Sequence, residues 1–239
     1  MDVNKFISNF KIAFGNYELP IVFWYSQTPA DKPIKSQGCF IKDLKPAREG
    51  GTVSFDRETI GCGGGKTYTG FSSPAPHIPN FVSVKEKYKE TPQLVTQYID
   101  KLAMPSKEGL FINFTSISNI STFEQKEGLI FFATPDVLSG LVSWAHFDTD
   151  ANQSDAVSAP FGSGCSLIIS HVVTENQNKG SRVFLGLFDP SVRPHVQPNI
   201  LSLAIPMSRF ATMYHTFEKT CLIDSNAWSK VQPRINAPD

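Results

Sequence analysis

The order of helix-like and strand-like segments is the feature that most restricts what this chain can fold into. Residues 20–26 and 129–133 are rich in β-branched and aromatic side chains, which is typical of buried strands. Apolar residues at helical spacing occur at 3–14 and 92–102. These segments do not follow the regular strand–helix alternation of a doubly wound fold. The sequence therefore predicts an α+β fold, with a mixed sheet or sheets and flanking helices.

The same criteria place the remaining elements. Further helices are expected from Thr134 to His146 and from Ser163, Pro206 and Ser225 onward, since Thr and Ser cap helices and Pro fits their first turn. Further strands are expected at residues 38–44, 51–55, 66–71, 110–117, 182–189 and 201–205.

Two stretches of the chain resemble each other in outline. An apolar strand ends at Thr28 and Pro29 in the first stretch and at Thr134 and Pro135 in the second. Each is followed by a Gly-Cys pair, Gly38–Cys39 and Gly164–Cys165, and then by a strand that reaches glycine, at Gly70 and at Gly186. We expect a single module over 1–239, with two similar halves at 18–117 and 127–219 related by a pseudo-two-fold axis. The alternative is coincidence between common strand–turn patterns.

Charge and hydropathy exclude several classes of protein. The chain has 239 residues, with 22 Lys and Arg against 22 Asp and Glu. A protein that binds nucleic acid through phosphate contacts usually has a basic excess, so no nucleic-acid partner is expected. The longest strongly apolar run, 129–133, is far shorter than the ~20 residues of a membrane span. The first ten residues lack the plan of a signal peptide.

From these properties we expect a soluble, cytoplasmic protein without a membrane partner. A net charge of zero gives little electrostatic repulsion between copies of the chain, so a homodimer is possible.

Phenylalanine is the unusual component, with 19 residues. Phe buries a large apolar area without needing a hydrogen-bond partner, so a Phe-rich core is one reading. The other reading is that some of the rings line a pocket for an apolar ligand. The sequence leaves both open.

Glycine occurs beside three of the four cysteines. Residues 61–65 (Gly-Cys-Gly-Gly-Gly), followed by Lys66 and Thr67, look like a phosphate-binding loop, but the first glycine that such a loop requires falls at Ile60. The residues after Lys66 also predict a strand rather than the helix that such a loop opens. A glycine loop can still approach a ligand closely, so Cys62, Gly63 and Gly64 are candidate binding residues.

A second glycine loop, 162–164, precedes Cys165. At a helix start the pKa of a thiol can be lowered, so Cys165 is the candidate catalytic residue, and Gly164 is a candidate ligand contact. Cys39 and Cys62 could converge on it to exchange disulfides or bind a soft metal. Dense packing around a small residue is the alternative.

Asp189 and Arg193 follow a predicted strand. The two side chains could pair with each other, or the guanidinium could hold an anionic ligand. No spacing of His and Cys predicts a zinc site. The loop that begins at Asp148 lacks the Gly and Glu of a calcium loop at Gln153 and Ala159. No metal site is therefore expected, and the sequence predicts no particular cofactor.

These residues occur in an order that resembles the domain of unknown function 169 family of archaea and bacteria. The resemblance extends from about Pro20 to Trp228. It depends on Gly38 and Cys39, 48–50, 60–64, Gly70 and Phe71, Tyr88, Thr91 and Pro92, 131–136, 162–165, Asp189 and Arg193. The resemblance implies one full-length module and brings no established activity with it. It draws attention to Cys39, Cys62, Cys165, Asp189 and Arg193.

Three functions remain open from the sequence. The first is the binding of a small, partly apolar or anionic ligand between the glycine loops at 61–65 and 162–164. The second is a cysteine-dependent redox, metal-binding or catalytic protein that uses Cys165 with Cys39 and Cys62. The third is an interaction protein without a small ligand. Whether the chain is an enzyme is left undecided.

Overall fold

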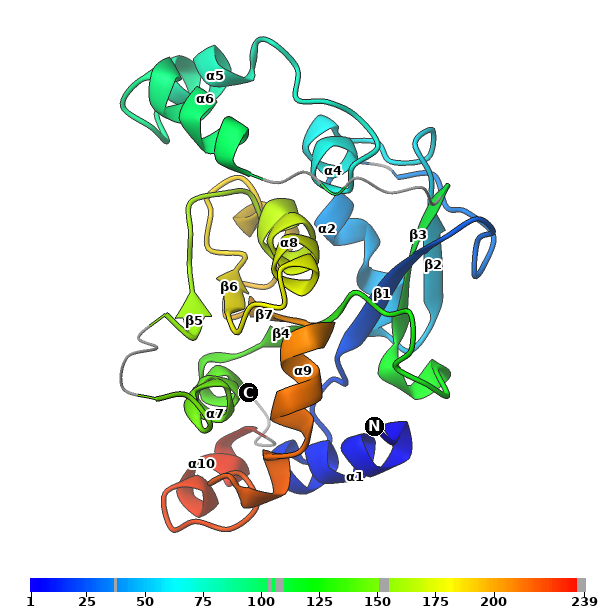
Figure 1. Cartoon of the computed structure of the whole chain (residues 1–239), viewed down its shortest axis with the longest axis vertical. Coiled ribbons are helices and arrows are strands. Elements are labelled where there is room, and N and C mark those ends of the chain that lie inside the picture. The colour runs from blue at the N-terminus through cyan, green and yellow to red at the C-terminus, as the bar shows by residue number, and fades with distance from the viewer. Residues whose placement is uncertain (37, 103–104, 106–109, 151–154, 236–239) are drawn as a thin grey trace.

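The structure is a computed structural model of the chain, and it describes residues 1–36, 38–102, 105, 110–150 and 155–235. Its centre is a seven-stranded sheet in the order β2-β3-β1-β4-β7-β6-β5 (Figure 1). The strands are β1 (Ile21–Ser26), β2 (Thr52–Phe55), β3 (Phe111–Ser116), β4 (Gly128–Ala133), β5 (Val157–Ser158), β6 (Val183–Gly186) and β7 (Leu201–Pro206). Neighbouring strands are antiparallel except β5 and β6, so the sheet is mixed and the α+β expectation is confirmed.

Helices flank this sheet. The α-helices are α1 (Val3–Phe14), α2 (Phe40–Asp43), α3 (Lys45–Arg48), α4 (Gly63–Tyr68), α5 (Ile78–Asn80), α6 (Pro92–Lys101), α7 (Pro135–His146), α8 (His171–Gln177), α9 (Met207–Tyr214) and α10 (Trp228–Ile235). Two π-helical segments are η1 (Phe81–Lys85) and η3 (Ser166–Ser170). Three short 3₁₀ turns are η2 (Ile117–Asn119), η4 (Arg193–His195) and η5 (Phe217–Lys219).

Both faces of the sheet are covered. In β4, Leu129 and Phe131 belong to one buried cluster, whereas Ile130 and Phe132 belong to the other. Successive side chains of a strand point to opposite faces, so β4 carries apolar residues to both. The first cluster lies against α1, α7, α9 and α10, and the second lies against α2, α3 and α8. This explains why the central strands are continuous apolar runs instead of alternating with polar residues.

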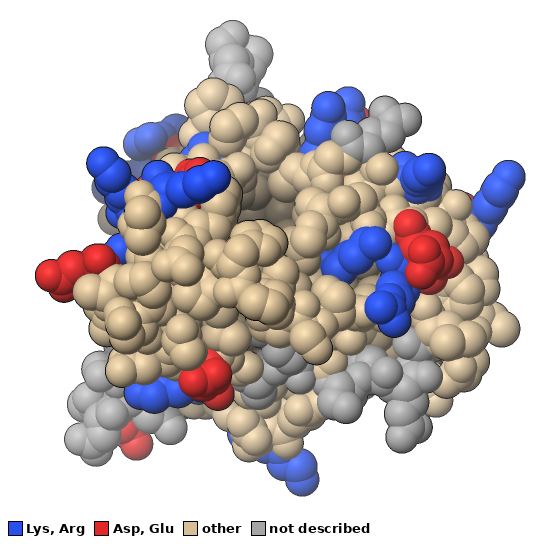
Figure 2. All heavy atoms as spheres, turned by 90° about the horizontal axis from the view of Figure 1, so that it is seen from above, with Lys and Arg blue, Asp and Glu red and all other residues tan. Residues whose placement is uncertain are grey.

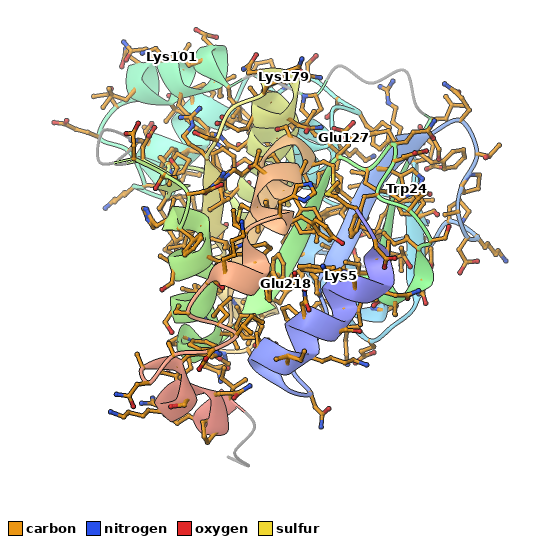
Figure 3. All side chains as sticks on the ribbon, turned by 60° about the horizontal axis from the view of Figure 1, so that its bottom comes forward. Lys5, Trp24, Lys101, Glu127, Lys179 and Glu218 are labelled. Atoms are coloured by element: carbon orange, nitrogen blue, oxygen red, sulfur yellow. The ribbon has the colours of Figure 1, made fainter. Side chains whose placement is uncertain are left out.

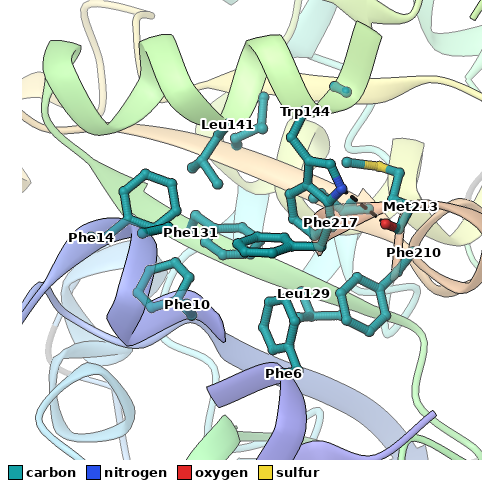
Figure 4. Close-up of a cluster of buried hydrophobic side chains, with 14 of the residues drawn as sticks. Phe6, Phe10, Phe14, Leu129, Phe131, Leu141, Trp144, Phe210, Met213 and Phe217 are labelled. Carbon is teal, nitrogen blue, oxygen red and sulfur yellow. Dashed lines mark hydrogen bonds between the residues drawn. The ribbon is translucent and has the colours of Figure 1, made fainter. Parts of the chain in front are cut away.

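The first cluster contains most of the aromatic packing. Rings of α1, α7, α9 and η5 meet over β4, with Phe6 edge-on to Phe210 at 5.0 Å and Trp144 edge-on to Phe217 at 4.7 Å between ring centroids (Figure 4). At the edge of the same layer, the Nζ of Lys5 lies 3.0 Å from a carboxylate oxygen of Glu218, which joins α1 to η5 (Figure 3). The Phe-rich core expected from the composition is therefore present.

Two of the expected strands are wrong. Residues 38–44 form α2 instead, because Phe40, Ile41, Leu44 and Ala47 are spaced to be buried on one helical face. Residues 66–71 lie largely in α4. That short helix begins because Cys62 occupies its N-cap and accepts the Gly65 amide at 3.2 Å.

Gly65 is required at this place in α4. A Cβ added there would lie 2.9 Å from the Cys62 sulfur and 3.0 Å from the Phe40 Cβ. Tertiary packing thus forces a glycine into a helix that its propensity disfavours.

The other elements follow the sequence closely. Asp2 caps α1 by accepting the Lys5 amide at 2.7 Å, and Gly15 ends the helix with φ 66°. The helices expected after Thr134, Ser163, Pro206 and Ser225 are present. The polar loop after Asp148 lies partly outside the described residues.

The sheet contains two arrays of strands with matching order. Once β5 is set aside, β2-β3-β1 and β6-β7-β4 are matching arrays that meet at the β1–β4 pair. The Gly38–Cys39 and Gly164–Cys165 pairs each precede a helical segment that leads toward the outer strand of its array, β2 or β6. The Gly70 and Gly186 pair does not correspond, because Gly70 follows α4 and Gly186 ends β6. The halves 18–117 and 127–219 stay a prediction.

His171 gives the fold a pH dependence. The imidazole packs at a tilt against Phe184, with 5.2 Å between ring centroids, and its Nε2 is buried with no hydrogen-bond partner among the described residues. Burial, followed by the nearby Arg182 charge, lowers the pKa of His171 to about 4. In the unfolded chain the pKa returns to 6.5, so the unfolded state binds the proton first as the pH falls. The free energy of unfolding should therefore decrease between pH 6.5 and 4, by up to roughly 3 kcal/mol from this group.

Urea denaturation of the wild type and of His171→Gln over this pH range checks the expectation. The difference in unfolding free energy between the two proteins should change with pH in favour of the variant at acid pH. A difference that stays constant would show that His171 is not responsible.

Candidate functional site

A cavity lies between a helical lobe and the rest of the described molecule. The helical lobe consists of α5, η1 and α6, residues 78–101, and stands at the top of Figure 1. The cavity has a volume of about 640 Å³, within the usual range for a small-molecule site. Figure 2 looks onto this end of the molecule, where the face is hollowed and uncharged residues predominate around the hollow.

The wall of the cavity is aromatic. Val95 and Ile99 add aliphatic surface from α6. Six rings line it, those of Tyr68, Phe81, Tyr88, Tyr98, Phe161 and Phe188. Three of the 19 phenylalanines thus line the cavity, while the large buried Phe side chains belong to the core. Most of the phenylalanines therefore build the core, and a few line a cavity.

Tyr98 joins the lobe to the body. Thr91 caps α6 by accepting the Leu94 amide at 3.3 Å, which fixes the start of the helix that carries Tyr98. The Tyr98 hydroxyl donates to the Ser166 hydroxyl at 3.3 Å, and its ring meets that of Phe161 edge-on at 5.1 Å. A Cβ added to Gly162 would lie 2.7 Å from the Tyr98 hydroxyl oxygen. Gly162 therefore allows the lobe to approach the body.

Both glycine loops reach this cavity, through residues that differ in part from the expected ones. Gly64 and Gly162 line it, as does Ser163. Gly164 is not part of the described cavity lining. It packs against the body instead, since an added Cβ would lie 2.9 Å from a side-chain carbon of Leu187 and 3.2 Å from one of Val192. Gly164 is thus a packing residue. Gly63 has open space around its Cα and lies outside the cavity lining of the described residues.

Asp189 lies on the body side of the cavity. Leu187, two residues before it, is buried with φ 64°, a left-handed conformation that costs a non-glycine residue roughly 1–3 kcal/mol. This turn ends β6 and directs Phe188 and Asp189 to the cavity wall. Ser191 donates to Asp189 Oδ1, and Oδ2 is buried without a hydrogen-bond partner among the described residues.

Arg193 has a different role from the expected anion contact. Its guanidinium donates to four backbone carbonyl oxygens, of Leu187 at 2.8 Å, Ile200 at 2.6 Å, Gln197 at 3.1 Å and Pro198 at 2.6 Å. These bonds tie together the loop between β6 and β7. Arg193 therefore positions the segment that carries Asp189 and is absent from the cavity lining of the described chain.

The charges and hydroxyls of the cavity define what it can hold. Its lining includes the carboxylates of Glu86 and Asp189 and, among the described residues, no Lys or Arg. Burial raises the pKa of Tyr68 and of Tyr98, so both phenols stay protonated at neutral pH and can donate hydrogen bonds. This electrostatic character does not favour the anionic ligand considered from the sequence.

The three glycine-flanked thiols lie near one another. Cys39 is at the N-cap of α2, and Cys62 is at the N-cap of α4. Cys165 lies in the first turn of the helical segment that continues as η3. Burial, followed by the proximity of Cys62 and Cys39, raises the pKa of Cys165 well above its ordinary value. Burial also raises the pKa of Cys39. The lowered pKa expected for Cys165 is therefore wrong, because desolvation outweighs the helix start.

No metal centre is evident in the part of the chain that the structure describes. There, no group of three or more His, Cys, Asp or Glu side chains is arranged to hold an ion. The four cysteines are free thiols.

Cys165 should resist alkylation in the native protein. Burial keeps its sulfur protonated and shielded, whereas Cys221 is only half-buried. Iodoacetamide at neutral pH, followed by peptide mass spectrometry, should label Cys221 while Cys165 remains unmodified, and both should react after denaturation. Equal labelling rates in the native protein would contradict this assignment.

Two π-helical segments flank the cavity. Phe81 and Val82 in η1 line it directly, and η3 begins just after Ser163 and supplies Ser166 to Tyr98. Single π turns within helices are rare and occur frequently at functional sites. The sequence signal for this site was limited to aromatic residues at helical spacing in α6 and to the glycine loops.

The fold and the site together define this protein as an α+β protein with a helical lobe and an aromatic cavity. The family model of DUF169, described as uncharacterised ArCR, matches residues 13–216. The chain therefore belongs to this family, as its motifs indicated. No curated protein and no solved structure matches it. Within the described residues, no helix is long and apolar enough to span a membrane.

Proposed function

We propose that this protein binds a small, partly apolar organic molecule in the cavity between the helical lobe and the body. The observation that carries this proposal is an aromatic-lined cavity of about 640 Å³. Apolar walls with a few convergent polar groups are characteristic of small-molecule sites. Here the polar groups are the hydroxyls of Tyr68, Tyr98 and Ser163 and the carboxylate of Asp189.

Other features of the site support a binding role. Leu187 lies immediately before two residues of the cavity lining, Phe188 and Asp189, and holds a strained backbone conformation. Strain of this kind concentrates at ligand sites. Phe81 and Phe188 line the cavity and are still 41% and 39% exposed. Exposed apolar rings at the cavity are surface that a partly apolar ligand would cover.

The cysteine-dependent alternative has less support. A thiol acts as a nucleophile or metal ligand through its thiolate, and the raised pKa of Cys165 and Cys39 keeps both protonated. An interaction protein without a small ligand would not need the cavity.

A cavity-filling variant tests the proposal. Ile99→Trp places a larger side chain into the cavity from α6, and Leu94→Trp is its control, because Leu94 is on the same helix, 40% exposed and outside the lining. Neutral 2-phenylethanol, followed in an NMR titration, should perturb the amide chemical shifts of residues 93–99, 161–163, 188, 189 and 191. The wild type and Leu94→Trp should respond alike, and Ile99→Trp should not respond.

The proposal would be overturned if neither 2-phenylethanol nor its charged analogues 2-phenylethylamine and phenylacetate changed these amide shifts in the wild type. It would equally be overturned by the same response in Ile99→Trp as in Leu94→Trp.

A further inference from the structure

We infer that the ligand of this cavity carries an organic ammonium group, held by the Asp189 carboxylate and the faces of the surrounding rings. This inference rests on the proposed function and adds the charge of the ligand to it. Three independent observations support it: the charges of the lining, the state of Asp189 and the position of Lys89.

The lining is electrostatically suited to a cation. The wall carries two carboxyl side chains, those of Glu86 and Asp189, and no Lys or Arg accompanies them among the described lining residues. The faces of aromatic rings carry the negative part of the ring quadrupole, so six rings add to the same preference. Within the described lining, an anionic ligand would face two carboxyl groups and no cationic side chain, since the Lys89 ammonium that contacts Phe161 lies outside that lining.

One carboxylate oxygen of Asp189 is an unused hydrogen-bond acceptor within the described chain. Its Oδ1 accepts from Ser191, while Oδ2 is buried and has no donor within the described chain. A buried carboxylate oxygen without a partner is unfavourable, and an ammonium N–H is the donor that compensates a carboxylate best. The Arg193 bonds to four carbonyls hold the loop in which this carboxylate sits. The acceptor is thus fixed in place before any ligand arrives.

The chain already places one ammonium group on a ring of the cavity. The Nζ of Lys89 lies 4.4 Å from the centroid of Phe161, within cation–π range. The same Phe161 ring contacts Tyr98 edge-on and lines the cavity. Lys89 itself is outside the lining, so it shows that this aromatic surface accommodates an ammonium without filling the space that a ligand would use.

Three ligands that share a phenyl ring and differ in charge test the inference in the unmodified protein. They are 2-phenylethylamine, which is cationic at neutral pH, neutral 2-phenylethanol, and anionic phenylacetate. Isothermal titration calorimetry at physiological ionic strength should rank the amine first, the alcohol second and the acid last. A hydrogen bond to a charged group predicts an amine affinity about tenfold to a hundredfold above that of the alcohol.

Asp189→Asn then tests the role of the carboxylate, with Asp136→Asn as the control. Asp136 is a carboxylate on α7 that pairs with Arg234 and lies outside the cavity lining. Asp189→Asn should lower the affinity for 2-phenylethylamine about tenfold or more and leave that for 2-phenylethanol within about twofold. Asp136→Asn should change neither. Glu86→Gln, at an exposed position, provides a second variant if Asp189→Asn does not fold.

The outcomes separate the two proposals. Equal binding of the amine and the alcohol, or tighter binding of phenylacetate, would overturn the ammonium inference and leave the cavity as a ligand site. Unchanged amine affinity in folded Asp189→Asn would overturn the role of the carboxylate. Failure of all three ligands to bind would overturn the proposed function together with the inference.

Discussion

Trp144→Ala should lower the free energy of unfolding by about 3–5 kcal/mol, which is the usual cost of removing a large aromatic side chain from a core. Trp144 is fully buried in α7 and contacts the rings of Phe6, Phe210 and Phe217 from three other elements (Figure 4). Its removal would leave a void at the point where α1, α7, α9 and η5 meet. Because these elements are distant in sequence, little local rearrangement can fill that void.

The hydrogen bond of Trp144 should contribute less to the free energy of unfolding than the burial of its ring does. Its indole N–H donates to the Met213 carbonyl at 2.9 Å, and that carbonyl also accepts from the Thr216 hydroxyl at 2.9 Å. The carbonyl therefore keeps a partner when the indole is removed. Trp144→Phe, which retains a ring, should cost less than half as much as Trp144→Ala.

Urea denaturation of both variants measures this prediction, with Ser143→Ala as the control. Ser143 is exposed on the same helix and should change the stability by a few tenths of a kcal/mol. Nearly equal losses for Trp144→Phe and Trp144→Ala would show that the hydrogen bond, and not the ring, dominates.

Asp148→Ala should also lower the free energy of unfolding by about 3–5 kcal/mol, because it leaves a buried cation without its counter-ion. Arg209 in α9 is only 5% exposed. Its guanidinium donates to both Asp148 oxygens, one of them at 2.9 Å, to the Ala145 carbonyl at 2.9 Å and to the Thr212 hydroxyl at 2.9 Å. The pair joins the end of α7 to α9.

The matching variant is Arg209→Met, which removes the buried charge and keeps an unbranched side chain. The Asp148 side chain left behind is 23% exposed and can be hydrated, so Arg209→Met should cost less than Asp148→Ala. The double variant should then be more stable than Asp148→Ala alone. Additive losses in a double-mutant cycle by urea denaturation would contradict this account of the pair.

The sequence predicted the elements whose signals are local. Asp2 and Gly15 set the ends of α1, and the apolar spacing of α6 and α7 was sufficient to place those helices. The strands β1, β3, β4 and β7 were identified by their composition. The strand expected at residues 182–189 was too long, since it ends where Leu187 takes a left-handed conformation that no local pattern indicates.

Short elements fixed by tertiary contacts could not be predicted. The helix α4 contains three glycines, and its geometry depends on the close contacts of Gly65 with Cys62 and Phe40. Nothing in residues 63–68 alone favours a helix over a turn. For the same reason the sequence indicated no structural partner for Asp148, which binds a buried arginine 61 positions later in the chain.

The candidate site was predicted in part. Gly64 and Asp189 were identified and do line the cavity, and the loop at 162–164 reaches it through Gly162. The burial of Cys165 and the commitment of Arg193 to backbone carbonyls arise from long-range packing, which spacing in the sequence does not encode. The contribution of the lobe, through Phe81, Tyr88 and Tyr98, required the three-dimensional arrangement.

The two ends of the sheet have a consequence for self-assembly. At one end β5 is only two residues long, which offers little backbone to another strand. At the other, the segment before α2 lies along β2, where the Ile34 amide donates to the Ser54 carbonyl at 3.2 Å and the Asp31 amide donates to the Ser54 hydroxyl at 3.1 Å. Both margins therefore discourage the edge-to-edge strand pairing through which sheets polymerise. A homodimer of this protein would have to form through side-chain surfaces and not by extension of the sheet.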